Sequence, residues 1–248
     1  MTRHLLVIGG QRCGTTGLAA LLDAHPEITM ARPARPEPKV FLSSELVDRG
    51  LPWYEATYFA HATTETLLGE KSTSYIEDAS AAERAATMLG VAEIVVQLRD
   101  PVRRAVSNWR FSSQHGVEER SLERALTENL TGPRDWDREQ TSVSPFAYLE
   151  RGRYADYLDP WFAAFPGRVH VRFLEDHLAD PTMIRQLYDA LAVDATFIPP
   201  TPERPVNESP GTAPELGTEL EQRLREYFAD SDTRLSERLS RALPWPAG

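Results

Sequence analysis

The sequence predicts an α/β fold in which helices cover both faces of a central, mostly parallel sheet. Short apolar runs alternate with amphipathic segments of helical length, and this alternation is typical of parallel strands joined by crossover helices. The chain has 248 residues, of which 41% are hydrophobic and 26% are charged, so it can bury one large core. We therefore predict a single domain over residues 1–248 with a three-layer α/β/α arrangement.

The predicted elements follow one another in a regular order. Buried strands are expected at 4–8, 93–98 and 169–173. Helices are expected at 14–24, 101–113, 121–129, 154–165, 181–191, 216–228 and 235–243. Asp100 and Asp180 each precede a proline, which favours a helix start because aspartate caps the first turn and proline fits it. The polar stretch at 114–151 is long for a compact domain, so we predict a lid or a substrate-facing insertion there.

The composition excludes several classes of protein. A net charge of −10 argues against a nucleic-acid partner and against a polybasic membrane-binding surface. Cys13 is the single cysteine, so neither an intramolecular disulfide nor a cysteine-built zinc site can form, and the six histidines lack metal-like spacing. The apolar run at 5–8 is too short for a signal sequence or a membrane span. We expect a cytoplasmic protein without a metal. Nothing in the sequence indicates an oligomeric state.

A glycine-rich loop, GGQRCGTT, runs from Gly9 to Thr16 between the first predicted strand and its helix. Backbone N–H groups at such a junction bind anions, and the helix dipole adds to the attraction. The spacing of Gly9 and Gly14 is that of a P-loop, but Thr15 stands where a kinase or nucleotide hydrolase has its lysine. Arg12 can supply positive charge instead. The loop predicts a phosphate site on a P-loop-type fold. The alternative is a glycine turn before a helix capped by a threonine hydroxyl.

A second candidate anion site follows the strand at 93–98. Arg99 ends that strand, and Ser107 lies two turns into the next helix. A guanidinium suits phosphate because it offers paired donors in one plane, and a hydroxyl can add a third contact. Arg103, one turn before Ser107, is either a further source of charge or an ordinary exposed arginine.

These two sites carry a resemblance to a known family. GGQRCGTTGL and VVQLRDPVRRAVSNW resemble the 5′-phosphosulfate-binding and 3′-phosphate-binding motifs of sulfotransferases that use 3′-phosphoadenosine-5′-phosphosulfate (PAPS). GEKSTSY, GRYADYLDPWFAAFP and VHVRFLEDHLADP are similar to further blocks of the bacterial and heparan-sulfate-type branch of that family. The resemblance covers residues 5–180 and extends weakly to the C-terminus.

The resemblance implies a reaction and the residues that bind the co-substrate. The family transfers the sulfuryl group of PAPS by in-line displacement to an acceptor and releases 3′-phosphoadenosine-5′-phosphate, without a metal. Arg99 and Ser107 then hold the 3′-phosphate. The 5′-phosphosulfate is held by Arg12, Cys13, Gly14, Thr15 and Thr16, with Arg12 also stabilising charge during the transfer.

The family's general base is a glutamate in a Lys-Glu-x-x-Phe-type segment, which Pro36 to Phe41 (PEPKVF) matches here. Glu37 aligns with the base, whereas Pro36 replaces the usual lysine. Of the 27 lysine and arginine residues, only Lys39 and Lys71 are lysines, and both fall in motif blocks. We predict that Lys71 stabilises the transferring group or the leaving oxygen, because a compact ammonium is not interchangeable with a guanidinium. Lys39 is the secondary candidate, and Glu70 is the candidate base should Glu37 not serve.

The acceptor is less defined than the cofactor. We expect a hydroxyl or amine of a small molecule or a saccharide, selected by the loop at 31–53 and by the insertion at 114–151. Aromatic side chains in these segments are predicted to line the acceptor pocket: Phe41, Trp53, Tyr54, Trp136 and Phe146. The family's glycine-basic loop has no basic counterpart at 206–211, where Arg204 is the nearest substitute. Two other functions are compatible with the sequence: an atypical P-loop kinase or nucleotide hydrolase, and a non-catalytic nucleotide-binding protein.

Overall fold

The computed structural model describes residues 2–137, 144–200 and 214–246. Within it the chain forms two compact units. The first comprises Met1–Leu98 and Tyr157–Asn207, and the second comprises Arg99–Asp156 and Glu208–Gly248. Among the described residues, no helix is both long enough and apolar enough to cross a membrane.

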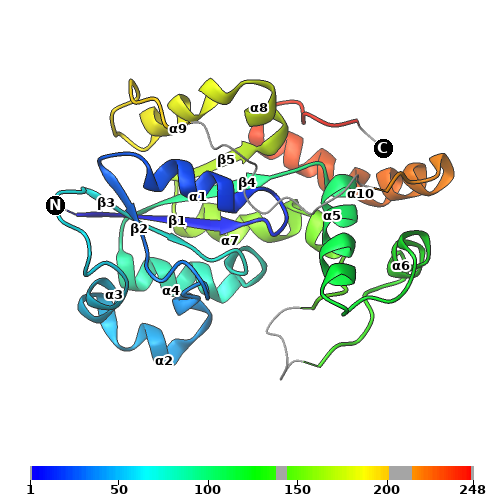
Figure 1. Ribbon diagram of the computed structural model, residues 1–248, viewed down its shortest axis with the longest axis horizontal. Helices are drawn as coiled ribbons and strands as arrows, with labels where there is room; N and C mark the ends of the chain where they lie inside the picture. Colours follow the sequence, from blue (N-terminus) through cyan, green and yellow to red (C-terminus); the bar gives the residue numbers. More distant parts are fainter. Residues whose placement is uncertain (1, 138–143, 201–213, 247–248) are drawn as a thin grey trace. The chain divides into compact units, whose positions relative to one another are not determined.

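The first unit is built on a five-stranded sheet in which every paired strand is parallel (Figure 1). The strand order is β2-β3-β1-β4-β5. The strands are β1 (Arg3–Gly9), β2 (Ile28–Met30), β3 (Leu67–Lys71), β4 (Ala92–Leu98) and β5 (Val169–Phe173). β1 and β4 are almost wholly buried, as expected for central strands of a sheet that is covered on both faces.

Helices cover both faces of this sheet. Figure 1 shows α1 (Thr15–Asp23), α8 (Leu174–Ala179) and α9 (Ile184–Ala190) on one face, and α3 (Gly50–Tyr58), α4 (Ala79–Leu89) and most of α7 (Ala155–Ala164) on the other. The short α2 (Ser44–Val47) precedes α3. The face that carries α1 and α9 is sealed by aliphatic side chains of the sheet and of both helices, including Leu5, Leu18, Val95 and Leu187. The predicted three-layer α/β/α fold is confirmed.

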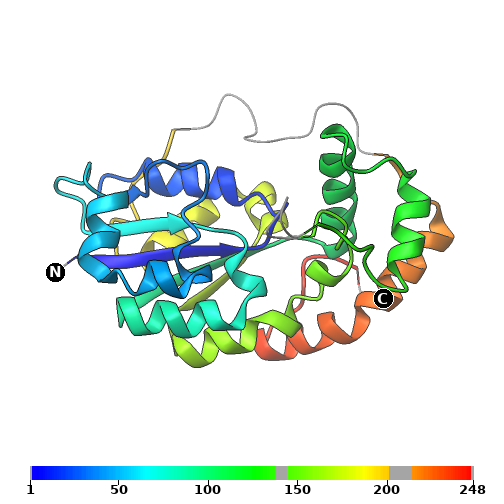
Figure 2. The ribbon, with the colours of Figure 1, turned by 90° about the horizontal axis from the view of Figure 1, so that it is seen from below.

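The second unit is helical and has its own core. It contains α5 (Pro101–Gln114), α6 (Leu122–Asn129) and the long α10 (Thr218–Leu239), which also appear in the view of Figure 2. Val102, Leu126, Leu149 and Phe228 are among the apolar side chains that pack between these helices.

The structure confirms the predicted elements and joins two of the predicted helices into one. The three predicted strands are β1, β4 and β5, and α1, α5, α6, α7 and α9 match the predicted helices. Asp100 caps α5 as expected, because its carboxylate accepts from the amides of Val102 and Arg103. The helices predicted at 216–228 and 235–243 are parts of one helix, since α10 runs unbroken through the polar stretch between them and ends at Leu239. Only the predicted break is wrong. The sequence did not predict β2, β3, α2, α3, α4 or α8.

Candidate active site

The loop after β1 has an unusual backbone that only some residues tolerate. Arg12 and Gly14 both have positive φ, at 66° and 79°. Gly14 is the N-cap of α1, so Thr15 and Thr16 are the first residues of the helix rather than its cap. The alternative of a threonine-capped helix is therefore wrong. Left-handed residues just before a helix N-terminus are typical of loops that bind anions through backbone N–H groups.

Gln97, near the end of β4, fixes the loop from the side. The backbone carbonyl of Gln97 accepts from the amide of Gly10 at 2.6 Å. Its side-chain Nε2 donates to the backbone carbonyl of Cys13 at 2.7 Å. A Cβ on Gly14 would lie 2.9 Å from Gln97 Nε2 and 2.9 Å from Leu174 Cδ1, so position 14 requires glycine for space as well as for φ. Gln97 thus binds the loop at Gly10 and Cys13, and Leu174 packs close to Gly14.

The carboxylate of Glu37 lies at the end of β3, the strand that pairs with β1. Glu37 Oε1 accepts a short hydrogen bond from Lys71 Nζ, and Glu37 Oε2 accepts from the amide of Thr73 at 3.0 Å. The Thr73 hydroxyl lies 3.2 Å from Oε2 as well. The side chains of Glu37 and Lys71 are 18% and 14% exposed, so the pair is mostly shielded yet still reaches the surface. Thr73 was not singled out from the sequence, although it stands two positions after Lys71 in the same block.

The strand register places Lys71 at the same edge of the sheet as the loop that follows β1. Lys71 pairs with Val7 of β1, and the amide of Ser72 donates to the carbonyl of Val7 at 3.1 Å. The loop at Gly9 begins two residues later. β1 is also the strand at which the order of the sheet reverses, with β3 on one side and β4 on the other. In open parallel sheets, ligands bind at the carboxyl ends of the strands at such a switch point.

Glu70 is not placed to act as a base, which corrects the expectation that it was the alternative to Glu37. Its side chain is fully buried, and three hydroxyl groups donate to its carboxylate: those of Ser72, Tyr75 and Tyr54. Burial raises the pKa of Glu70, while these three hydrogen bonds oppose the rise.

The predicted aromatic lining of an acceptor pocket is wrong at three of its five positions, one of which is Phe146, buried in the core of the second unit. Phe41 and Tyr54 are fully buried and pack against one another, and Phe41 also packs against Tyr75. These rings form part of the core of the first unit. Trp53, by contrast, is partly exposed and carries the guanidinium of Arg49 at 4.8 Å from the centre of its ring.

The predicted 3′-phosphate residues belong to the second unit. Arg99 directly follows β4, and its carbonyl accepts from the hydroxyl of Tyr154 at 2.8 Å. Ser107 is on α5, and both side chains are partly exposed. Asp100, between Arg99 and α5, is buried and is bound by both terminal nitrogens of Arg225, at 2.7 and 2.8 Å. Asp100 therefore serves as a helix cap and as the partner of an arginine.

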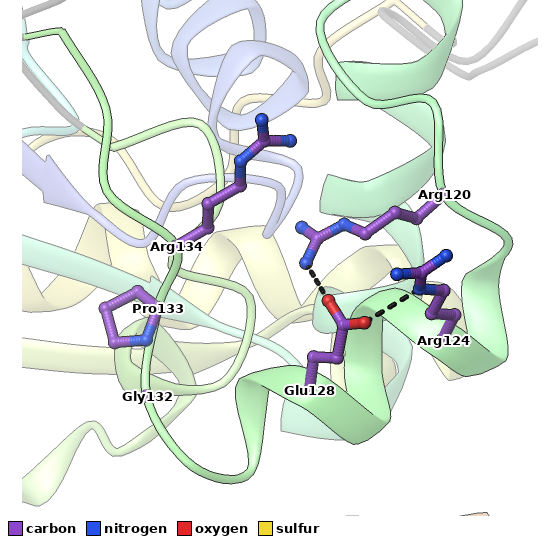
Figure 3. Close-up of a pocket in the computed structure, with 6 residues that line it drawn as sticks. All are labelled: Arg120, Arg124, Glu128, Gly132, Pro133 and Arg134. Atoms are coloured by element: carbon purple, nitrogen blue, oxygen red, sulfur yellow. Dashed lines mark hydrogen bonds and ion pairs between the residues drawn. The ribbon is translucent and has the colours of Figure 1, made fainter.

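The insertion at 114–151 contains a cavity of about 520 Å³ within the second unit. Figure 3 shows Glu128 between Arg120 and Arg124, with Arg134 on the opposite side. Glu128 accepts from both neighbouring guanidiniums, and the buried Glu118 binds two further nitrogens of Arg120. The positive charge of the cavity is therefore largely neutralised by the protein's own carboxylates. Within the described residues, no group of His, Cys, Asp and Glu side chains is arranged to hold a metal ion. The stretch at 206–211 and Arg204 lie outside the described residues.

The chain belongs to the sulfotransferase family. A family model described as a sulfotransferase domain matches residues 2–189, which cover the whole sheet and both candidate anion sites. This match confirms the family that the two motifs predicted.

Known relatives agree with this assignment. The chain is 31% identical over 169 residues to the bifunctional heparan sulfate N-deacetylase/N-sulfotransferase 1 of Caenorhabditis briggsae, a match that covers 65% of this chain and 19% of that protein. It is 32% identical over 175 residues to the human bifunctional heparan sulfate N-deacetylase/N-sulfotransferase 3, covering 65% of this chain and 19% of the relative. The match thus spans about a fifth of the length of these curated relatives.

A solved structure shares the fold. The sulfotransferase from Alicyclobacillus acidocaldarius superimposes with a TM-score of 0.79 over 98% of each chain, at 23% sequence identity. At this identity the likeness concerns the fold alone.

Proposed function

We propose that this protein transfers a sulfuryl group from PAPS to a hydroxyl or amine of a small-molecule or saccharide acceptor and releases 3′-phosphoadenosine-5′-phosphate. The observation that carries the proposal is the pairing of Glu37 with Lys71 at the end of β3, beside the phosphate loop of β1. A base and a cation are the two groups that sulfuryl transfer needs from side chains.

Glu37 is proposed to be the general base. An acceptor O–H or N–H loses its proton to the carboxylate as its bond to sulfur forms and the bond from sulfur to the bridging oxygen breaks. The amide of Thr73 fixes one oxygen of Glu37. The other oxygen faces Lys71, so the direction of the carboxylate is set before an acceptor arrives.

Lys71 is proposed to stabilise the negative charge that develops during transfer. An ammonium has three N–H donors, so Lys71 can bind Glu37 and contact a sulfuryl or bridging oxygen at the same time. Arg12 in the phosphate loop is proposed to act on the same charge from the other side.

The co-substrate is proposed to bind through two separate anion sites. PAPS supplies an activated sulfuryl group when bound. The loop from Arg12 to Thr16, which includes Cys13, Gly14 and Thr15, holds the 5′ end, while Arg99 and Ser107 hold the 3′-phosphate. The positive φ of the loop and the space for glycine alone at position 14 support the first assignment.

The acceptor class rests on the relatives and on the insertion at 114–151. Two relatives are named as heparan sulfate N-sulfotransferases, which supports a saccharide amine among the acceptors to be tried. The cavity of the insertion is a place where acceptor contacts can be made. A cytoplasmic location is part of the proposal, since the single Cys13 gives no need for an oxidising compartment.

A binding panel followed by a turnover assay tests the proposal. Thermal shift with 3′-phosphoadenosine-5′-phosphate, ATP and GTP, each with and without magnesium, is expected to show stabilisation by the first ligand alone and no dependence on magnesium. Turnover is then measured as release of that product from PAPS with a panel of hydroxyl compounds and amino sugars. Magnesium-dependent stabilisation by ATP would favour a kinase, and binding without turnover of any acceptor would favour a non-catalytic nucleotide-binding protein.

A further inference from the structure

A buried carboxylate lies near the proposed base. Glu70 is fully buried on β3, one residue before Lys71. Its Oε1 accepts from the hydroxyls of Ser72 at 2.6 Å and Tyr75 at 2.5 Å, and its Oε2 accepts from the hydroxyl of Tyr54 at 2.6 Å. A fully buried carboxylate is costly unless several donors compensate it, and here three hydroxyls do so.

Two of these hydroxyls also bind the segment that carries Glu37. The amide of Lys39 donates to Ser72 Oγ at 2.9 Å, and the amide of Phe41 donates to the Tyr75 hydroxyl at 3.2 Å. A hydroxyl has one proton and two lone pairs. Because each hydroxyl donates its hydrogen bond to Glu70, the lone pairs of both oxygens are left to accept from the two amides.

The segment needs such support because its backbone is strained. Lys39 has φ 53°, in the left-handed region that a residue with a side chain seldom adopts. Glu37 lies two residues earlier and is itself bound by Lys71 and Thr73. The stretch from Glu70 to Tyr75 therefore holds the base directly and also holds the strained turn that follows it.

We propose that Glu70 is a positioning residue for the general base, acting through the hydroxyls of Ser72 and Tyr75 on the backbone of the 37–41 segment. This inference rests on the proposed function and deepens it. Glu70 itself is shielded from any acceptor. We call the contacts from Glu70 through these two hydroxyls to the backbone the hydroxyl relay. The relay requires an acceptor at the Oε1 position of residue 70 that orients both hydroxyl protons.

Two tyrosines give a matched pair of variants. Tyr75→Phe and Tyr54→Phe each delete one buried hydroxyl that binds Glu70, but only the Tyr75 hydroxyl also contacts the 37–41 segment. We expect both to lower the thermal midpoint by similar amounts. Tyr75→Phe should lower kcat about tenfold or more by misaligning the base, with the KM for the acceptor changed less than threefold, whereas Tyr54→Phe should keep kcat within about twofold. Equal losses of kcat in the two variants would overturn the relay.

Substitution of Glu70 separates positioning from catalysis. In Glu70→Gln the amide oxygen can take the place of Oε1 and accept from Ser72 and Tyr75, while the amide nitrogen donates to Tyr54. We expect this variant to retain kcat within about threefold with the shape of its pH profile unchanged, and Glu70→Leu to lose far more. Loss of turnover in Glu70→Gln as complete as in Glu37→Gln would make Glu70 a catalytic group and overturn the proposal.

A measurement without turnover keeps this inference separate from the proposed function. Hydrogen exchange reports on the amides of Lys39 and Phe41. Protection of Phe41 should fall about tenfold in Tyr75→Phe, protection of Lys39 should fall likewise in Ser72→Ala, and both should persist in Tyr54→Phe. Unchanged protection in the first two variants contradicts the relay whether or not the chain transfers sulfuryl groups. The expected loss of protection in these variants, together with no turnover of any acceptor, would contradict the proposed function alone.

Discussion

Gln97 Nε2 donates a hydrogen bond of 2.7 Å to the carbonyl of Cys13 and so connects β4 to the phosphate loop. The backbone carbonyl of Gln97 also accepts from the amide of Gly10 at 2.6 Å. One residue therefore holds both ends of the loop, and Arg99 of the second candidate anion site follows it by two positions. The shape of the loop depends on this contact as well as on its glycines.

Removal of the Gln97 side-chain amide should weaken nucleotide binding. Gln97→Leu keeps the volume and loses a buried hydrogen bond to a carbonyl, at a cost of about 1–3 kcal/mol. We expect the affinity for 3′-phosphoadenosine-5′-phosphate and for AMP to fall by the same factor, since both are proposed to use the 5′ site. Calorimetry measures both, with the exposed Gln222→Leu as the control. A loss confined to the 3′-phosphorylated ligand would contradict the loop-fixing role.

Glu37→Gln should abolish turnover and leave nucleotide affinity within about twofold of the wild type. The amide cannot take a proton from the acceptor, whereas its oxygen can still accept from Thr73. Steady-state release of 3′-phosphoadenosine-5′-phosphate at saturating acceptor measures the first effect, and calorimetry measures the second. Glu45→Gln, an exposed glutamate on α2, is the control. Wild-type turnover in Glu37→Gln would remove Glu37 from the mechanism.

Lys71→Ala should lower kcat and kcat/KM together. The proposed charge appears only in the transition state, so its loss affects the chemical step and not ground-state binding alone. Lys71→Arg should restore little, because the planar guanidinium differs in shape from the ammonium that binds Glu37. Rates across a range of acceptor concentrations separate the two parameters. An increase of KM with unchanged kcat would instead make Lys71 a ground-state binding residue.

The stability of the second unit should depend on the titration of Asp232. Burial raises the pKa of this carboxyl from 3.8 to about 6, against a hydrogen bond from Trp245. Because the folded state binds the proton more tightly than the unfolded state, the stabilisation is complete below about pH 4 and is lost as the pH rises through 6. Asp232→Asn, whose oxygen can still accept from Trp245, should flatten this dependence and raise the free energy of unfolding at pH 7. Denaturant unfolding between pH 4 and 8 measures it, and parallel curves for the two proteins would refute the assignment.

The sequence predicted the central strands and the glycine loop between β1 and α1 because their signals are local. β4 is rich in Ile and Val and leads into Asp100-Pro101, and the loop has its glycines at fixed spacing. β3 was missed because LLGEK has no β-branched residue and ends in charges. It is a strand because it pairs in parallel with β1 and β2. The pairing of Glu37 with Lys71 joins residues 34 positions apart, so no local pattern could reveal it. The buried state of Glu70 and Phe41 likewise arises from tertiary packing.

The final prediction distinguishes a PAPS enzyme from a general phosphate-binding protein. The wild type should bind 3′-phosphoadenosine-5′-phosphate much more tightly than AMP, which lacks the 3′-phosphate. In the double variant Arg99→Ala, Ser107→Ala this difference should largely vanish, because the 5′ end is served by the loop from Arg12 to Thr16 alone. A charge-assisted hydrogen bond contributes about 1.5–3 kcal/mol, so the affinity for the 3′-phosphorylated ligand should fall at least about tenfold while AMP binding barely changes.

Calorimetry with both nucleotides measures this difference, and Arg223→Ala, an exposed arginine on α10, is the control for a general loss of positive charge. A fall in affinity for both ligands would indicate that α5 or the loop is disturbed, and it would contradict a separate 3′ site. Equal affinity of the wild type for the two nucleotides would refute the second anion site altogether. The loop could then still bind a phosphate, but nothing would favour PAPS over other nucleotides. The reason is that AMP has the same 5′-phosphate as 3′-phosphoadenosine-5′-phosphate and lacks only the 3′-phosphate that Arg99 is proposed to bind.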